Sequence, residues 1–373
     1  MNNTRPLRIL VFNWRDSAHP NAGGAEMYTQ RVAMAWIEMG HSVTLFCASA
    51  PGHPSEEVVG GVRTIRRGSK HTVYREAKHF YRREGQGQYD LVVDEVNTRP
   101  FLAPKWVNDA PVIALIHQVC REVWFSEFHL PIAFIGRFIL EPWWLRTYRN
   151  VQTVTLSQSS LESLKDYGLR NIVIVAAGMD PEDKLPEVKR ETEPTVIFVG
   201  RLAANKRPSD ALEAFRLVKE SIPTAKMWVI GTGPLERKLH QSAPPGVEFL
   251  GHVSEREKRE RLARANVLIV TSVREGWGLV VTEAAQCSTI TVGYDVPGLR
   301  DSITASGGIL VSPSPIELGR VLAPVLLQRD SQASFNVAPN GVSEWIDVAQ
   351  QILNVSMFRK SDVVEDNGLD RNP

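Results

Sequence analysis

The stretch VLIVTSVREGWGLVVTEAA, residues 267–285, decides the fold. Its first four residues form an apolar run that is typical of a buried parallel strand. The residues from Leu279 to Ala285 favour a helix, and the join before them contains Gly276 and Gly278. Glycine lets backbone amides approach a ligand closely, and a helix N-terminus attracts anions. The stretch therefore predicts a strand, a ligand-binding turn and a helix of an α/β protein.

Two carboxylates, Glu275 and Glu283, frame this turn. The eight residues from one to the other span about 12 Å in a helix, at about 1.5 Å per residue. The paired carboxylates of a glycosidase lie roughly 5 to 9.5 Å apart. We therefore interpret Glu275 and Glu283 as holding two ends of one long ligand, with the helix N-terminus between them, rather than as flanking one bond.

The composition is that of an ordinary globular protein. The chain has 373 residues, which favours two domains, and it is 43% hydrophobic and 23% charged. A net charge of +1 argues against a general nucleic-acid binder. The three cysteines are too scattered for a metal motif or a disulfide framework, which indicates a reducing compartment. Without a signal peptide or a run of about 18 apolar residues, a cytoplasmic location is expected, with room for peripheral contact at the inner face of the membrane.

Strand and helix patterns alternate along the first half. An apolar run at residues 7–14 is followed by a polar loop, a helical pattern that begins near Ala25, and a second strand at 41–46. Further strands are expected at 62–65, 90–96, 112–117, 151–157 and 171–175, with a serine-capped helix at 159–167. This alternation predicts a doubly wound sheet. The loop does not read GxGxxG, so a dinucleotide cofactor is disfavoured.

Two features of the first half point toward a ligand crevice. Gly23 and Gly24 precede the first helix, either as a tight turn or as a ligand contact. His117 ends the strand at 112–117, and ligands of open α/β sheets bind beyond the carboxyl ends of the strands. His117 is therefore expected in the crevice, although a lone histidine is more often structural.

Two other segments of the first half allow contact with lipid. Residues 70–83 carry basic and aromatic side chains on one helical pattern, which is typical of a solvated face and also of a helix on an anionic membrane. Residues 119–149 are rich in aromatic residues and are expected to form a helical insertion that packs the domain, shapes an acceptor pocket or meets lipid.

A polar, proline-bearing stretch at 178–194 separates the halves. We therefore expect a first Rossmann-like domain at 1–177, a linker at 178–194 and a second domain at 195–340. A closing helix at 341–359 is expected to pack back toward the first domain, and 360–373 is expected to be disordered.

Strands in the second half end in glycine-rich or polar turns, and a helix capped by Ser209 is expected at 210–221. Arg201 follows the strand at 195–199, with Lys206 shortly after it. The turn at 231–234 follows the strand at 225–230. Because parallel strand ends share one edge, these cations and backbone amides predict an anion-binding edge. Alone, each cation would be interpreted as a surface charge.

Taken together, these motifs resemble the family-4 retaining glycosyltransferases, whose GT-B fold has two facing Rossmann-like domains with the cleft between them. The second half carries the likeness in VGRL at 199–202 with Lys206, in GTGP at 231–234, in LGHV at 250–253, and in EGWGL at 275–279 with Glu283. This last pattern resembles the family's Glu-x7-Glu signature. In the first half, GGAE at 23–26 resembles the family's glycine-rich acceptor-side loop and His117 its strand-end histidine.

The resemblance implies a retaining transfer of a hexose-type sugar from a nucleoside-diphosphate sugar to a hydroxyl acceptor, without a metal or other cofactor. The acceptor would be a glycan, a lipid-linked glycan or a natural-product aglycone. Arg201 and Lys206 would hold the donor diphosphate, Glu283 the ribose and Glu275 the transferred sugar.

The resemblance assigns further residues to the donor. The backbone near Val253 would meet the base, and His117 would bond the transferred sugar near the reacting carbon, which makes His117 and Glu275 the candidate catalytic residues. The remaining donor-binding candidates are turn residues: Gly23, Gly24, Gly231, Gly276, Trp277, Gly278 and Leu279.

Two departures from the family pattern concern turns. Asn205-Lys206-Arg207 stands where the family often has Glu-Lys-Gly, and QCSTI at 286–290 replaces the family's usual glycine and proline. These changes put turn geometry and donor preference in doubt. The alternatives are a sugar-nucleotide epimerase or phosphorylase on the same fold, or a sugar-binding protein without chemistry.

Overall fold

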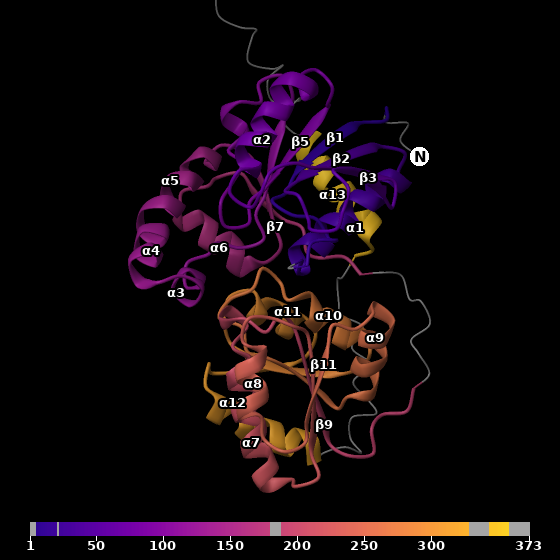
Figure 1. Cartoon of the computed structure of the whole chain (residues 1–373), viewed down its shortest axis with the longest axis vertical. Helices are drawn as coiled ribbons and strands as arrows, with labels where there is room; N and C mark the ends of the chain where they lie inside the picture. The colour runs from indigo at the N-terminus through magenta and orange to yellow at the C-terminus, as the bar shows by residue number, and fades with distance from the viewer. Residues whose placement is uncertain (1–4, 21, 180–187, 328–342, 358–373) are drawn as a thin grey trace, which may run out of the picture.

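A computed structural model of the chain describes residues 5–20, 22–179, 188–327 and 343–357. Two sheets organise it, one in each half of the chain (Figure 1). The expected α/β fold with two doubly wound sheets is confirmed. The expected tail at 360–373 and parts of the expected linker and second domain, at 180–187 and 328–340, lie outside the described residues.

The first sheet has eight strands in the order β3-β4-β2-β1-β5-β6-β7-β8. Every neighbouring pair is parallel except β3 and β4, which form an antiparallel edge. The strands are β1 (Arg8–Phe12), β2 (Ser42–Cys47), β3 (Glu56–Val59), β4 (Val62–Arg66), β5 (Leu91–Glu95), β6 (Val112–Leu115), β7 (Gln152–Thr155) and β8 (Ile172–Ile174).

Helices and short turns connect these strands. They are α1 (Gly24–Glu38), α2 (Val73–Phe80), η1 (Tyr81–Gly85), η2 (Ala103–Lys105), α3 (Val123–Glu127), α4 (Leu130–Ile135), η3 (Gly136–Leu140), α5 (Glu141–Leu145), η4 (Arg146–Tyr148) and α6 (Gln158–Asp166). The segment from α3 to η4 is the helical insertion expected from its aromatic content.

The second sheet has six parallel strands in the order β11-β10-β9-β12-β13-β14. They are β9 (Thr195–Val199), β10 (Lys226–Ile230), β11 (Val247–Gly251), β12 (Val267–Val270), β13 (Ile290–Tyr294) and β14 (Ile309–Val311). The helices between and after them are η5 (Ala204–Lys206), α7 (Pro208–Ser221), α8 (Glu236–Ser242), α9 (Glu255–Arg264), α10 (Leu279–Gln286), α11 (Leu299–Ala305) and α12 (Pro315–Leu327).

Apolar side chains on both faces of each sheet are buried, as parallel strands between helices require. The last described helix, α13 (Trp345–Met357), packs against α1 although it follows the second sheet in sequence. The indole Nε1 of Trp36 donates to the Ala349 carbonyl at 3.0 Å. The end of the chain is therefore attached to the first half, beside the strands of the first sheet (Figure 1).

The structure corrects two predicted helix starts. Ser209 does not cap α7, because the helix begins at Pro208 and Arg207 is the N-cap in a left-handed conformation, with φ of 48°. Proline at the first helical position fixes a helical φ and needs no N–H. Helix α6 begins at Gln158, and its capping serine is Ser157, whose side chain accepts from the Ser160 amide.

Candidate active site

The loop between β12 and α10 carries the Glu275 motif, and glycine is required there at two points. Gly278 has φ of +85°, a left-handed conformation that side chains disfavour. A methyl group on Gly276 would lie 2.9 Å from the carbonyl oxygen of His117. The loop is therefore folded tightly against the first half of the chain, and Gly276 and His117 meet there.

Trp277 and Leu279 strengthen this contact. The Trp277 side chain is buried and packs with the core cluster of the first sheet, while its Nε1 donates to Thr282 at 2.9 Å. Leu279 packs against the same cluster, and a methyl on Gly24 would lie 3.5 Å from it. The Trp277 indole thus joins the two halves. In residues 276–279, at the start of α10, this leaves the backbone for contact with a ligand.

Glu275 lies beside a cation from a different strand end. Its carboxylate forms an ion pair with the ammonium of Lys206 in η5 and accepts from Ser272 Oγ at 2.6 Å. The carbonyls of Lys206 and Arg207 each accept from Thr271 Oγ1 at 2.9 Å, which fixes η5 against the end of β12. The structure therefore brings together two predicted residues that lie 69 positions apart.

Arg201 and Gly231 lie at the ends of adjacent strands, β9 and β10. A methyl on Gly231 would come within 2.1 Å of the Gly200 carbonyl oxygen, so only glycine allows the two turns to touch. The Arg201 guanidinium is partly exposed and lies 3.8 Å from Glu127 of α3. This edge of the second sheet thus presents two cations with the close-packed turns that an anion site needs.

Glu283 lies one turn into α10 and is paired with Lys258 of α9 at 2.9 Å. Burial lowers the pKa of the Lys258 ammonium, but Glu283 and Glu255 outweigh it and hold that pKa above its usual value. Val253, half-buried in the turn between β11 and α9, packs against the same core cluster as α10. Lys258 was not predicted, because α9 is charged along most of its length and no single lysine stands out in it.

His117 follows β6 and is buried, with its ring edge-on to Tyr28 at 4.9 Å between centroids. Its Nε2 lies 3.4 Å from Glu95 Oε1 without forming a hydrogen bond. The other Glu95 oxygen accepts from Thr29 and from Asn13 at 2.7 Å. Burial raises the pKa of Glu95, and His117 and Thr29 oppose that rise. Glu95 was not predicted from the sequence, although a carboxylate at the end of a buried strand needs such partners.

Gly23 and Gly24 begin α1, with Gly23 as the N-cap. The Gly23 amide donates to Glu26 at 2.7 Å, and Glu26 is paired with Arg15 at 2.6 Å. The Glu26 carboxylate thus already accepts the hydrogen bond of the Gly23 amide. Gly24 is exposed and faces Leu279.

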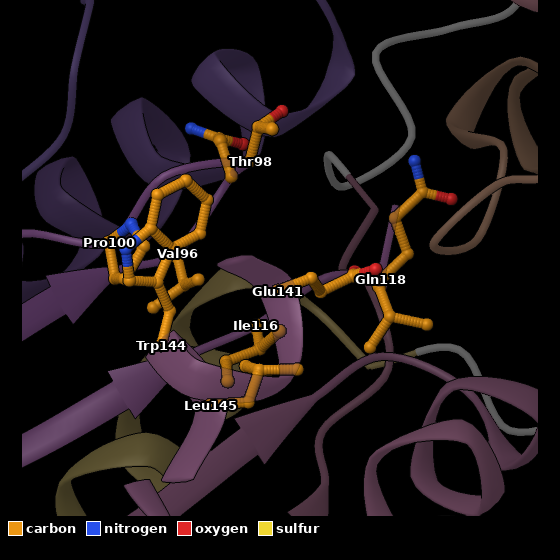
Figure 2. Close-up of a pocket in the computed structure, with 10 residues that line it drawn as sticks. Val96, Thr98, Pro100, Ile116, Gln118, Glu141, Trp144 and Leu145 are labelled. Carbon is orange, nitrogen blue, oxygen red and sulfur yellow. The ribbon is translucent and has the colours of Figure 1, made fainter. Parts of the chain in front are cut away.

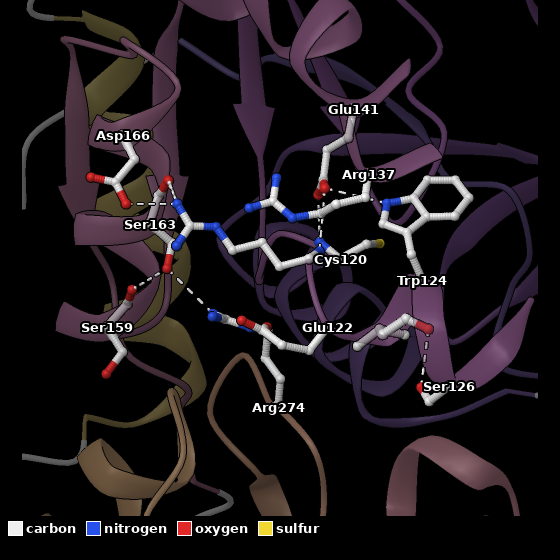
Figure 3. Close-up of polar contacts among 12 residues, drawn as sticks. Cys120, Glu122, Trp124, Ser126, Arg137, Glu141, Ser159, Ser163, Asp166 and Arg274 are labelled. Carbon is white, nitrogen blue, oxygen red and sulfur yellow. Dashed lines mark hydrogen bonds and ion pairs between the residues drawn. The ribbon is translucent and has the colours of Figure 1, made fainter. Parts of the chain in front are cut away.

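Arg274, directly before Glu275, braces the two halves. Its guanidinium is 3% exposed, and it donates from Nε to Glu122 at 2.8 Å and from one Nη to Ser163 Oγ at 3.3 Å (Figure 3). A second link joins the Ser159 amide to Asp301 at 3.2 Å. The Glu275 loop is therefore held against α6 and the start of the aromatic insertion, which the sequence pattern did not reveal.

A small pocket lies beyond the carboxyl ends of β5 and β6 (Figure 2). Its volume is about 10 Å³, roughly what one water molecule occupies, so no sugar fits there. Its lining comes from the two strand ends and from α5: Val96, Asn97, Thr98, Pro100, Ile116, Gln118, Val119, Glu141, Trp144 and Leu145.

Comparison with known proteins identifies the family of the chain. Residues 179–338 match the family model described as glycosyl transferases group 1, and residues 22–183 match that of glycosyltransferase family 4. Glycogen synthase of Mycobacterium tuberculosis is 24% identical over 88% of this chain and 87% of its own length.

Two solved structures show the same fold. Sucrose-phosphate synthase from Thermosynechococcus elongatus superposes with a TM-score of 0.74 at 17% identity, covering 96% of this chain and 100% of that one. Anabaena HepE, solved with UDP and glucose, gives 0.69 at 17% identity, with 93% and 98% covered.

The two α/β sheets and these structural neighbours define the GT-B fold. The chain belongs to the family-4 glycosyltransferases, as its sequence motifs predicted.

Proposed function

We propose that the protein is a retaining, metal-independent glycosyltransferase that moves a hexose from a nucleoside-diphosphate sugar to a hydroxyl acceptor. The observation that carries this proposal is the meeting of Lys206 and Glu275 at one sheet edge, with His117 of the other half against Gly276. A cation suited to a diphosphate and a carboxylate suited to sugar hydroxyls thus meet at the loop that packs on the backbone of His117 from the other half.

The donor would lie along this edge. Arg201 and Lys206 would bind the diphosphate and stabilise the charge that develops on it as the sugar leaves. Amides at the N-terminus of α10 would add to that stabilisation. Glu283 would accept from the ribose hydroxyls and the backbone near Val253 would meet the base. Glu275 would hold hydroxyls of the transferred sugar.

Retention follows from attack on the face that the leaving group vacates. The acceptor oxygen would bond to the anomeric carbon as the bond from that carbon to the phosphate oxygen breaks. The acceptor proton would pass to the departing phosphate oxygen, so no protein nucleophile is needed. His117 would orient the sugar near the reacting carbon, and Glu95 would hold the imidazole in place.

Uridine diphosphate glucose is the first donor to test, because HepE, which shares the fold, has been solved with UDP and glucose. A cytoplasmic site of action is part of the proposal, since the cysteines Cys47, Cys120 and Cys287 are all buried and free, as a reducing compartment allows.

The test is donor turnover with and without sugar acceptors in excess chelator, measured by mass spectrometry, with nuclear magnetic resonance to assign the configuration of donor and product sugars. We expect transfer that continues in chelator and gives a product with the donor's anomeric configuration. Loss of activity that magnesium restores would contradict metal independence. Donor interconversion without an acceptor would indicate an epimerase, and the lack of calorimetric binding of any nucleotide sugar would indicate a non-enzymatic role.

A further inference from the structure

The aromatic insertion exposes far more apolar surface than any other part of the chain that the structure describes. Nine of the fifteen exposed large apolar residues fall between positions 125 and 143. They are Phe125, Phe128, Leu130, Ile132, Phe134, Ile135, Phe138, Ile139 and Trp143, with 40% to 65% of each residue exposed. We call this set the apolar face. Clusters of this kind on a protein surface mark interaction sites.

The apolar face is held outward by a built scaffold. Buried Glu141 accepts from the amides of Cys120 at 2.6 Å and Arg121 at 3.2 Å, and from Trp124 Nε1 at 3.2 Å (Figure 3). Trp124 is buried, and Gly136 packs so close to its ring that a methyl there would come within 2.3 Å. The insertion therefore has its own small core, and the apolar face lies outside that core.

Several of these side chains form one continuous surface. The rings of Phe125 and Phe134 are 5.3 Å apart, and those of Phe134 and Phe138 are stacked at 5.7 Å. Helices α3, α4 and α5 lie along the outer edge of the first half, away from α1 and α13 (Figure 1). The apolar face is therefore accessible to an extended partner.

Positive charge borders the apolar face on one side. Lys105 lies over the Trp143 ring at 5.2 Å, and Arg146 and Arg149 are exposed just beyond α5. Between residues 128 and 149 the only acidic residue is Glu141, which is buried. Glu127, between Phe125 and Phe128, is exposed, and it lies 3.8 Å from Arg201. Aromatic and aliphatic side chains beside exposed cations are complementary to an anionic lipid surface.

The apolar face also adjoins the candidate donor site. Helix α3, which carries Phe125, lies against η5, which carries Lys206. Glu127 of α3 is 3.8 Å from Arg201. An acceptor held at a membrane surface beneath α3 and α4 would therefore reach the donor edge without leaving that surface.

We propose that the apolar face binds the surface of an anionic lipid bilayer and, resting on the proposed transfer function, positions the enzyme for acceptors that carry a lipid. The face would enter the headgroup region, with Trp143 at the polar boundary. Lys105, Arg146 and Arg149 would contact the anionic headgroups. The apolar face contains none of the candidate donor-binding residues, so its binding to lipid does not require donor.

The test is co-sedimentation of the full chain with vesicles of phosphatidylcholine, with or without phosphatidylglycerol. Binding is expected to the mixed vesicles and to be weaker to neutral ones. Phe134→Ser with Phe138→Ser should weaken binding at least about tenfold, because both exposed rings are lost. Lys105→Gln should weaken it about fivefold in mixed vesicles only, as one headgroup contact is lost. Ile316→Ser, which changes an equally exposed residue of α12, is the matched control and should bind normally.

Circular dichroism of every variant detects misfolding. Calorimetric affinity of every variant for uridine diphosphate tests the donor site, so that failure of the donor site can be distinguished from failure of this proposal. Leu130→Ser with Ile139→Ser is a second double variant, which removes exposed aliphatic side chains and leaves the phenylalanine ring contacts in place. Absence of binding to mixed vesicles, or equal binding by wild type and both double variants, would overturn the proposal. Concentration-dependent self-association that these variants abolish, without vesicle binding, would instead assign the apolar face to a second copy of the chain and overturn it too.

Discussion

Replacing Glu275 with glutamine should separate nucleotide binding from sugar transfer. In the free protein, Glu275 forms an ion pair with the ammonium of Lys206. The donor diphosphate would bind that same ammonium and would have to compete with Glu275. The two side chains are 14% and 29% exposed, so the pair is only partly screened by water. Glutamine keeps the size of the side chain and still accepts from Ser272, but it removes the competing charge.

The expected change in affinity follows from the energy of that pair. A hydrogen bond between charged groups contributes about 1.5–3 kcal/mol when buried. Partial exposure reduces it to about 1 kcal/mol here, or roughly fivefold in affinity. Glu275→Gln should therefore bind uridine diphosphate about fivefold more tightly, whereas Lys206→Met should bind it at least about tenfold more weakly, because a charge-assisted contact is lost. Turnover of the sugar donor should fall strongly in both variants.

Titration calorimetry with uridine diphosphate and a donor-turnover assay measure the two effects separately. Glu248→Gln, which changes an exposed carboxylate on β11 of the same sheet, serves as the control and should change neither quantity. If Glu275→Gln weakens nucleotide binding as much as Lys206→Met does, Glu275 supports the site structurally and the role given to it is wrong.

Three further changes test the surroundings of the site. Glu95→Gln should lower turnover about tenfold or more without changing nucleotide affinity, because it loosens His117; a matching loss of affinity by calorimetry would refute this role. Glu122→Gln weakens the brace to Arg274 by about 1 kcal/mol, since Glu122 is half exposed, and should lower turnover severalfold; unchanged turnover would show that the brace has no part in catalysis. Burial raises the pKa of Asp94 to about 6. Its carboxyl therefore ionises at lower pH in the unfolded chain than in the folded one. The free energy of unfolding of wild type relative to Asp94→Asn, measured with urea, should fall by up to about 3 kcal/mol as pH rises from about 4 to 7. A relative stability that rises with pH would contradict this prediction.

Much of the fold could be predicted from the sequence because its signals are local. Buried parallel strands are short apolar runs, and the glycine turns that end them mark one sheet edge. The antiparallel strand β3 and the helices α8 and α11 were not predicted. Each helix has only seven residues, which is too short for an apolar period to stand out. The Ser209 cap was wrong because Pro208 already fixes the start of α7.

The candidate site could be predicted only in part, because the sequence signals are local and the contacts of the site are not. Residues in strand-end turns, such as Arg201 and Gly276, are recognisable from their positions in the pattern. Their partners are not, because the contacts join distant parts of the chain. Glu122 accepts from Arg274, which is 152 positions away, and the sequence of neither segment indicates this contact. Glu95 was hidden because a carboxylate within a strand pattern gives no sign of which groups surround it.

A crystal structure of this chain with uridine diphosphate glucose would show directly where the donor binds. We expect a diphosphate within reach of Arg201 and Lys206, a ribose on Glu283, and a hexose between Glu275 and His117. A nucleotide bound against the first sheet, with Arg201 and Lys206 left untouched, would contradict this expectation.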